Sequence, residues 1–165
     1  MSDWESSSLA RVLPPACPRK LAKVPFVELA DGRVQGVVSS GSDIGRVYVS
    51  SVLAGTYEFA CSTNNNRPCG GARGSFCNHI LALITEAVLQ YGAERVARYL
   101  RVEPDEPSAQ AIADAMIGTR PSQGDRGAAA AVFSRFLRHL AYLELAPSTA
   151  PVPEMQWFPP TRAVV

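Results

Sequence analysis

Three cysteines and a histidine gather between positions 61 and 79 of this 165-residue chain: Cys61, Cys69, Cys77 and His79. Soft thiolates with one imidazole are the ligand set of tetrahedral zinc, and four protein ligands close the coordination shell as in a structural site. Cys61 ends a predicted strand, and Cys77-Asn78-His79 lies where a helix should begin, so both side chains of that pair can reach one ion. The sequence therefore predicts a bound Zn²⁺ and no catalytic residue.

The segment between these ligands, residues 62–76, has almost no aliphatic side chain, so something other than a core must hold it. Glycines at 70, 71 and 74 allow its backbone to bend tightly around a metal. Three thiolates and Zn²⁺ sum to a formal charge of −1, and Arg67 and Arg73 are placed to offset it as donors close to the ligands. We expect metal binding to be part of folding, because the site does not exist in the unfolded chain.

Other interpretations of these residues remain open. The three cysteines could be buried free thiols, or two of them could form a disulfide, although no export signal precedes them. Cys17 stands apart in a proline-rich segment and is expected to be a spare thiol. His139 shares a helix face with arginines and is expected to be exposed rather than catalytic.

The elements that must position the ligands follow from hydrophobic periodicity. Patterns rich in β-branched residues predict three or four antiparallel strands, the first two joined by a turn at Asp31-Gly32. Apolar residues at helical spacing follow His79 as far as Gly92. The predicted strands cover residues 24–29, 34–38, 46–50 and 56–61, and further helices are predicted at 93–101, 107–117 and 126–145, the last with Asp125 as a candidate N-cap.

These elements predict an α+β fold: a small antiparallel sheet and a helix forming a zinc finger of ββα type, followed by a C-terminal helical extension. One core should dominate a chain of this length. The extension is expected to pack on the finger because a ββα unit alone buries little apolar surface. The predicted parts are an irregular arm at 1–23, the finger at 24–92, the extension at 93–145 and a proline-rich tail at 146–165.

Two short strings resemble the SWIM zinc finger. They are Tyr57-Glu58-Phe59-Ala60-Cys61-Ser62 and Cys77-Asn78-His79-Ile80-Leu81-Ala82-Leu83, and that family's pattern is Cys-x-Cys, a variable loop, then Cys-x-His and an aliphatic helix. The resemblance covers about residues 34–92. It departs at Thr63, which stands where the family has its second cysteine, and Cys69 is the obvious replacement.

The resemblance implies a zinc-stabilised module that binds protein or nucleic acid, as in bacterial helicase-like ATPases, plant transposase-related proteins and some ubiquitin ligases. Compact bacterial SWIM proteins resemble components encoded beside MoxR-type ATPases and von Willebrand A domain proteins, which favours a protein partner by association. The excess of arginine over lysine, 14 to 2, fits a GC-rich bacterial genome.

Three classes of function follow. We expect a protein-interaction adaptor, because the net charge of +1 gives no bulk attraction to nucleic acid and Trp157-Phe158 could serve as an anchor. The alternative is DNA or RNA binding through local arginines, although nearby Glu94, Glu103, Asp105 and Glu106 favour an ordinary solvated face. The arginines in question are Arg67, Arg73, Arg95, Arg98, Arg101, Arg135 and Arg138.

Catalysis is not expected. Four candidate protein ligands leave no open metal position for water, and neither the deaminase signature, a phosphate-binding Gly-rich loop nor a Gly-x-Ser-x-Gly elbow occurs. No apolar run reaches membrane-spanning length and the first residues do not form a signal peptide, so we expect a cytoplasmic protein with no membrane contact and no small-molecule substrate.

Overall fold

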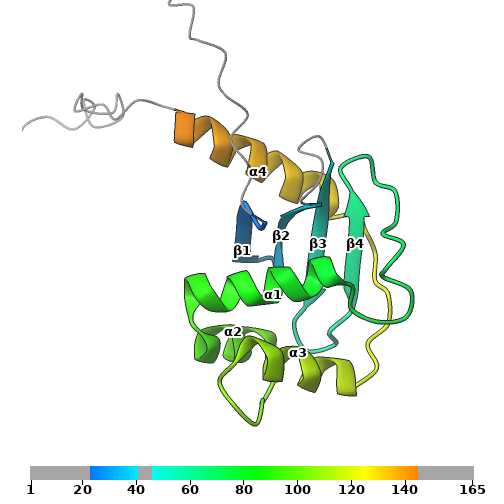
Figure 1. The fold of residues 1–165 in the computed structure, drawn as a ribbon, viewed down its shortest axis with the longest axis vertical. Coiled ribbons are helices and arrows are strands. Elements are labelled where there is room, and N and C mark those ends of the chain that lie inside the picture. Colours follow the sequence, from blue (N-terminus) through cyan, green and yellow to red (C-terminus); the bar gives the residue numbers. More distant parts are fainter. Residues whose placement is uncertain (1–22, 41–45, 145–165) are drawn as a thin grey trace, which may run out of the picture.

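The computed structural model describes residues 23–40 and 46–144 of the chain (Figure 1). An antiparallel sheet of four strands and four helices confirms the predicted α+β class. In chain order the elements are β1 (Phe26–Ala30), β2 (Arg33–Ser39), β3 (Val47–Leu53), β4 (Phe59–Thr63), α1 (Asn78–Tyr91), α2 (Ala93–Leu100), α3 (Ala109–Gly118) and α4 (Ala129–Glu144).

The strands follow one another in the sheet in the order β1-β2-β3-β4. The β1–β2 turn is at Asp31-Gly32, as predicted, with φ of 53° and 69° at its two residues. A two-residue turn with both φ values positive matches the right-handed twist of the strands that it joins. This turn sets the register Ala30↔Arg33, from which the pairing of the whole β1–β2 ladder follows.

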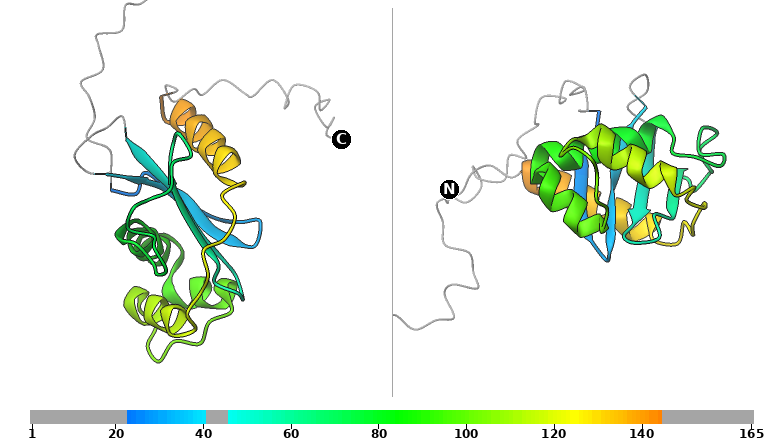
Figure 2. Two further views of the ribbon diagram at one scale, coloured as in Figure 1. Left: turned by 90° about the vertical axis from the view of Figure 1, so that its right-hand side faces the viewer. Right: turned by 90° about the horizontal axis from the view of Figure 1, so that it is seen from below.

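Helices cover both faces of the sheet (Figure 2). On one face α1, backed by α2 and α3, packs on the larger core cluster, which includes Val34, Val38 and Val52. On the other face α4 places Val132 and Phe136 against Val37 and Val49. Successive residues of a strand point to opposite faces, and β2 is buried on both sides because helices cover both. Leu137, on the outer side of α4, is exposed.

The β4 edge of the sheet is covered by the chain itself. Ser62 forms a β-bridge with Pro68, and Phe59 forms one with Gln123 in the segment that leads to α4. Gly124 also donates its N–H to the Phe59 carbonyl at 2.8 Å. These contacts occupy backbone groups that an open edge would present to other chains.

Two sequence predictions change or fall outside this description. Helix α4 begins at Ala129, so Asp125 is not at its N-cap position. Cys17, Trp157 and Phe158, with most of the predicted arm and the proline-rich tail, lie outside the described residues. Within the part of the chain that is described, no helix is long and apolar enough to cross a membrane.

Candidate metal centre

The four predicted ligands come together from three parts of the chain. Their ligand atoms, three sulfurs and an imidazole nitrogen, all lie within 4.8 Å of one another. The Nδ1 atom of His79 is 3.8 Å from the Cys61 sulfur, 3.4 Å from the Cys69 sulfur and 3.9 Å from the Cys77 sulfur. The three cysteines are buried and reduced, and His79 is half-buried. The cluster can therefore hold one metal ion close to the surface.

A tight turn after β4 explains why Cys69 is a ligand candidate and Thr63 is not. The Thr63 N–H donates to the Arg67 carbonyl at 2.8 Å, and the Thr63 hydroxyl accepts the Arg67 N–H at 3.1 Å. Asn66, at φ 57°, closes the turn in the left-handed region that asparagine tolerates. The returning chain then donates the Cys69 N–H to the Cys61 carbonyl at 3.0 Å, which puts the two sulfurs side by side.

Cys77 and His79 are held by the beginning of α1. Cys77 is the N-cap residue, with extended φ and ψ of −85° and 168°, and its side chain makes no capping hydrogen bond. A hydrogen bond from Cys61 lowers the pKa of the Cys77 thiol to about 4, against the opposing effect of burial. This lowered pKa also includes the smaller effects of a hydrogen bond from His79 and of the backbone N–H groups of Ile80 and His79. The helix N-terminus thus favours a thiolate, the form that binds a metal.

The pKa of the Cys61 thiol shifts in the opposite direction when no metal is bound. Its pKa is raised well above the ordinary value because the Cys61 thiol donates its proton to Cys77 and because the side chain is buried. The Ser50 hydroxyl, 3.3 Å from the Cys61 sulfur, opposes this by donating to the sulfur. A cation would replace the shared proton, so metal binding here releases protons.

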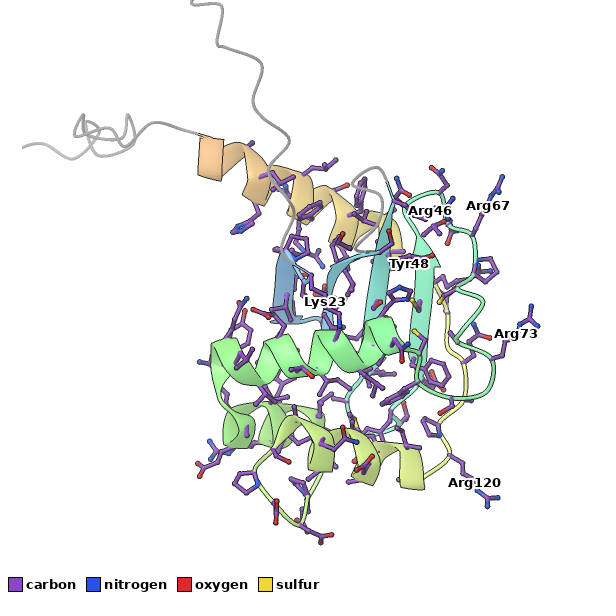
Figure 3. All side chains as sticks on the ribbon, viewed as in Figure 1. Lys23, Arg46, Tyr48, Arg67, Arg73 and Arg120 are labelled. Atoms are coloured by element: carbon purple, nitrogen blue, oxygen red, sulfur yellow. The ribbon has the colours of Figure 1, made fainter. Side chains whose placement is uncertain are left out.

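Tyr48 fixes the position of the imidazole. Its ring stacks on that of His79 with centroids 3.8 Å apart and an interplanar angle of 16°. Figure 3 shows Tyr48 beside the sulfur atoms, between the sheet and the first turn of α1. Neither Tyr48 nor Ser50 was among the predicted site residues. The signal that could have found them is the strand pairing, because Ser50 faces Cys61 and Tyr48 faces Thr63 across the ladder.

The loop is less isolated than its composition predicts. Ala72 and Phe76 are buried in the same core cluster as the cysteines, and the Phe76 ring meets Phe59 edge to face at 5.3 Å. The inference that nothing apolar anchors residues 62–76 was therefore wrong. A small methyl group and one aromatic ring therefore anchor the end of the loop that precedes Cys77, in addition to the ligands.

The arginines singled out from the sequence do not form one patch. Arg67 and Arg73 lie exposed on the loop, and no contact of their guanidinium groups with a cysteine occurs among the described residues. Arg135 lies on the opposite face of the sheet, where it binds Glu28 at 2.7 Å and Asp31 at 3.3 Å. Arg138 is exposed on the same helix, α4, and Arg95, Arg98 and Arg101 belong to α2 and its C-cap.

Comparisons with protein-family models, with curated proteins and with solved structures found no match to this chain. The site is therefore defined by its own geometry. It is a cluster of three cysteines and one histidine at the junction of a strand, a turn and a helix N-terminus.

Proposed function

We propose that this chain is a non-catalytic binding module in which Cys61, Cys69, Cys77 and His79 hold one structural zinc ion. The observation that carries the proposal is the convergence of four soft or borderline ligand atoms within 4.8 Å of one another. Three cysteines with one histidine form a common structural zinc site.

The separations support a tetrahedral ion. With metal–sulfur and metal–nitrogen bonds of about 2.3 and 2.0 Å, a tetrahedral angle puts sulfur and nitrogen about 3.5 Å apart and two sulfurs about 3.8 Å apart. The three distances from His79 Nδ1, between 3.4 and 3.9 Å, lie close to the first value. The bound ion needs only small movements of these side chains.

A closed shell of four protein ligands supports a structural rather than a catalytic ion. Catalytic zinc keeps one position for water, and a general base must lie within reach of that water. Among the described residues, the groups beside the ligands are a serine hydroxyl, a tyrosine ring and apolar side chains of the core. None of these is an acid or base suited to activating water near neutral pH.

The arrangement supports a SWIM-like finger with a displaced ligand. The β3–β4 hairpin and α1 supply Cys61 and the Cys77-x-His79 pair in the order expected of a ββα module. Cys69 takes the place of the family's second cysteine because the turn at 63–67 returns it to Cys61. This assignment concerns the zinc module alone, and the association with MoxR-type ATPases stays a prediction.

A module of this kind acts by binding another macromolecule. The sequence favoured a protein partner because of the near-neutral charge, the association with MoxR-type ATPases and the Trp157-Phe158 pair, and that pair lies outside the described residues. The described surface carries a different feature, a group of unpaired cations beside the metal centre, which favours the alternative partner.

Metal analysis of purified variants tests the zinc assignment. We expect one zinc per chain in the unaltered protein and in Cys17→Ala, and loss of stoichiometric zinc in Cys69→Ala. Removing zinc with a chelator should lower the melting temperature by roughly 10 °C or more, since the site contributes on the order of several kcal/mol.

The Cys17→Ala variant is the matched control because it removes a thiol that is not among the four proposed ligands. Retention of zinc by Cys69→Ala together with its loss from Cys17→Ala would show that the ligand set is wrong. A metal-free purified protein whose melting is unchanged by chelator would remove the proposal altogether.

A further inference from the structure

Cations gather at the end of the sheet where β4 leads into the metal-binding loop. We call Lys23, Arg46, Arg67 and Arg73 the basic rim; all four are exposed. Figure 3 shows Arg46 at the upper end of β3, Arg67 and Arg73 pointing outwards from the loop beside β4, and Lys23 apart from these three, just above α1 in this view. Three of the four residues are arginine, whose planar fork matches phosphate oxygens.

Backbone pairing places three of these residues along one line. The backbone carbonyl of Lys23 accepts the Ser39 N–H at 2.8 Å. Ser39 pairs across the sheet with Val47, the neighbour of Arg46. The Val47 carbonyl in turn accepts the Asn64 N–H at 3.0 Å, at the start of the turn that ends with Arg67. The backbones of Lys23, Arg46 and Arg67 therefore follow one another across the same end of the sheet, and the side chains of Arg46 and Arg67 lie closest to the metal-binding loop.

The basic rim is not neutralised by neighbouring acids in the described residues. There the ion pairs are those of Arg135 with Glu28 and Asp31, so none of the four cations takes part in one. The sequence from Phe59 to Thr85 contains no acidic residue. Asp43 precedes Arg46 in the sequence but lies outside the described residues.

Acidic side chains collect at the other end of the sheet. Asp31 lies in the β1–β2 turn, and Glu58 precedes β4. Glu103, Asp105 and Glu106 lie in the α2–α3 loop, where they line an open pocket. This loop follows the end of α2, whose Leu100 carbonyl accepts the Gly55 N–H of the β3–β4 turn. Arg33 at the start of β2 and Arg101 at the C-cap of α2 also lie at this end, so the acidic residues there stand beside cations.

The groups between the cations suit nucleotides better than an acidic protein. Asn64, Asn65 and Asn66 are exposed between Arg46 and Arg67, and amides of this kind can hydrogen-bond to base edges. The stacked rings of Tyr48 and His79 are only half-buried beside them. Since His79 covers one face of the Tyr48 ring, a base could stack only on the other, and cations with a partly exposed aromatic ring are a combination that binds single-stranded nucleic acid.

We infer that the basic rim binds the phosphates of single-stranded nucleic acid, with Tyr48 and the asparagine turn facing the bases. This inference rests on the proposed function in one respect, because the metal holds the loop that carries Arg67 and Arg73. The proposed ligand is single-stranded nucleic acid, either DNA or RNA, since both present the same phosphate chemistry.

Fluorescence anisotropy with labelled oligonucleotides of about 20 nucleotides, longer than a typical single-strand site, tests the inference on the full chain. The probes are a mixed-sequence DNA strand, the matching RNA strand, the DNA duplex and polyglutamate. We expect one or both single strands to bind in a salt-dependent way and more tightly than the duplex or polyglutamate. Arg46→Gln/Arg67→Gln should weaken single-strand binding on the order of tenfold or more at low salt.

The dependence of log K on log salt should also become shallower by about 1.4 in this double variant, or about 0.7 for each lost phosphate contact. Arg138→Gln is the control, since it removes an exposed arginine from α4 on the opposite face. The zinc content and melting temperature of each variant are measured alongside.

Several results would overturn the inference. These are absence of single-strand binding at low salt, equal weakening by Arg138→Gln, tighter binding of the duplex, and equal binding of polyglutamate, which would indicate an acidic protein partner. If zinc is stoichiometric and no oligonucleotide binds, the proposal of nucleic-acid binding is refuted and the proposal of a zinc module is retained. If single-stranded oligonucleotides bind as expected to a protein without zinc, the proposal of a zinc module is refuted and that of nucleic-acid binding is retained.

Discussion

At the scale of single residues, the metal centre includes a hydrogen bond from a serine that no sequence motif identifies. Ser50 and Ser51 are neighbours on β3, but alternation along the strand turns Ser50 towards Cys61 and Ser51 towards the α4 face. The Ser50 hydroxyl is the donor that partly offsets the charge on the Cys61 sulfur. Such outer hydrogen bonds tune how tightly ligands hold a metal.

Replacing Ser50 by alanine should therefore weaken zinc binding by about 10- to 100-fold, because the Cys61 thiolate loses its hydrogen-bond donor. Competition with a chromogenic chelator measures this change. Ser51→Ala is the matched control and should leave the affinity unchanged. Equal affinities for both variants would show that the Ser50 contact has no part in metal binding.

Residue types and spacing were sufficient to predict the ligand set as a cluster, since few other roles bring three cysteines and a histidine so close in sequence. Ser50 and Tyr48 could not be predicted in the same way. Their roles depend on the β3–β4 register, Ser50↔Cys61 and Tyr48↔Thr63, which is fixed by the turn between the strands. A shift of one residue would turn both side chains to the other face.

At the scale of elements, the approach of α1 to the sheet depends on a residue without a side chain. Gly36 lies in the middle of β2, opposite Val27 of β1. A Cβ atom at this position would collide with the backbone carbonyl oxygen of Phe26 and lie 2.8 Å from the Leu83 side chain of α1. Glycine in a strand interior often marks such a close approach.

Gly36→Ala should lower the free energy of unfolding by about 1–3 kcal/mol, because β1 must shift away from β2 and the Leu83 side chain of α1 must move to admit the methyl group. Chemical denaturation measures the change. Gly118→Ala is the control, since its Cβ would meet nothing within 4 Å and alanine suits the end of α3. A Gly36→Ala protein as stable as the unaltered chain would refute this account of the packing.

Periodicity predicted the existence and order of all these elements, and their boundaries less well. The last helix starts at Ala129 because residues 122–124 first run beside β4, a tertiary contact that no local pattern encodes. Likewise Leu137 lies 50% exposed on α4, while its neighbour Phe136 is buried against the sheet.

At the scale of the whole molecule, two hydrophobic cores on opposite faces of one sheet both stabilise the fold. The metal centre adjoins only the larger core, and the smaller one under α4 contains no ligand. Loss of the metal should therefore loosen the loop and the start of α1 before it unfolds the sheet. This differs from small zinc fingers, which are unfolded without metal.

Hydrogen exchange of the zinc-loaded and the chelated protein tests this division. Chelation should remove protection from residues 64–77, including the Cys69 amide, which is bonded to the Cys61 carbonyl. Protection in β2, β3 and α4 should remain, because their packing does not involve the ion. Uniform loss of protection in all elements would show that the metal supports the entire fold.

The central claim is that one ion is bound by three sulfurs and one nitrogen of this chain, with no open position. X-ray absorption at the zinc edge of the purified protein tests it most directly. The account predicts three sulfur neighbours at about 2.3 Å and one nitrogen neighbour at about 2.0 Å. Two sulfurs with additional oxygen or nitrogen neighbours, or a protein that contains no zinc, would contradict it.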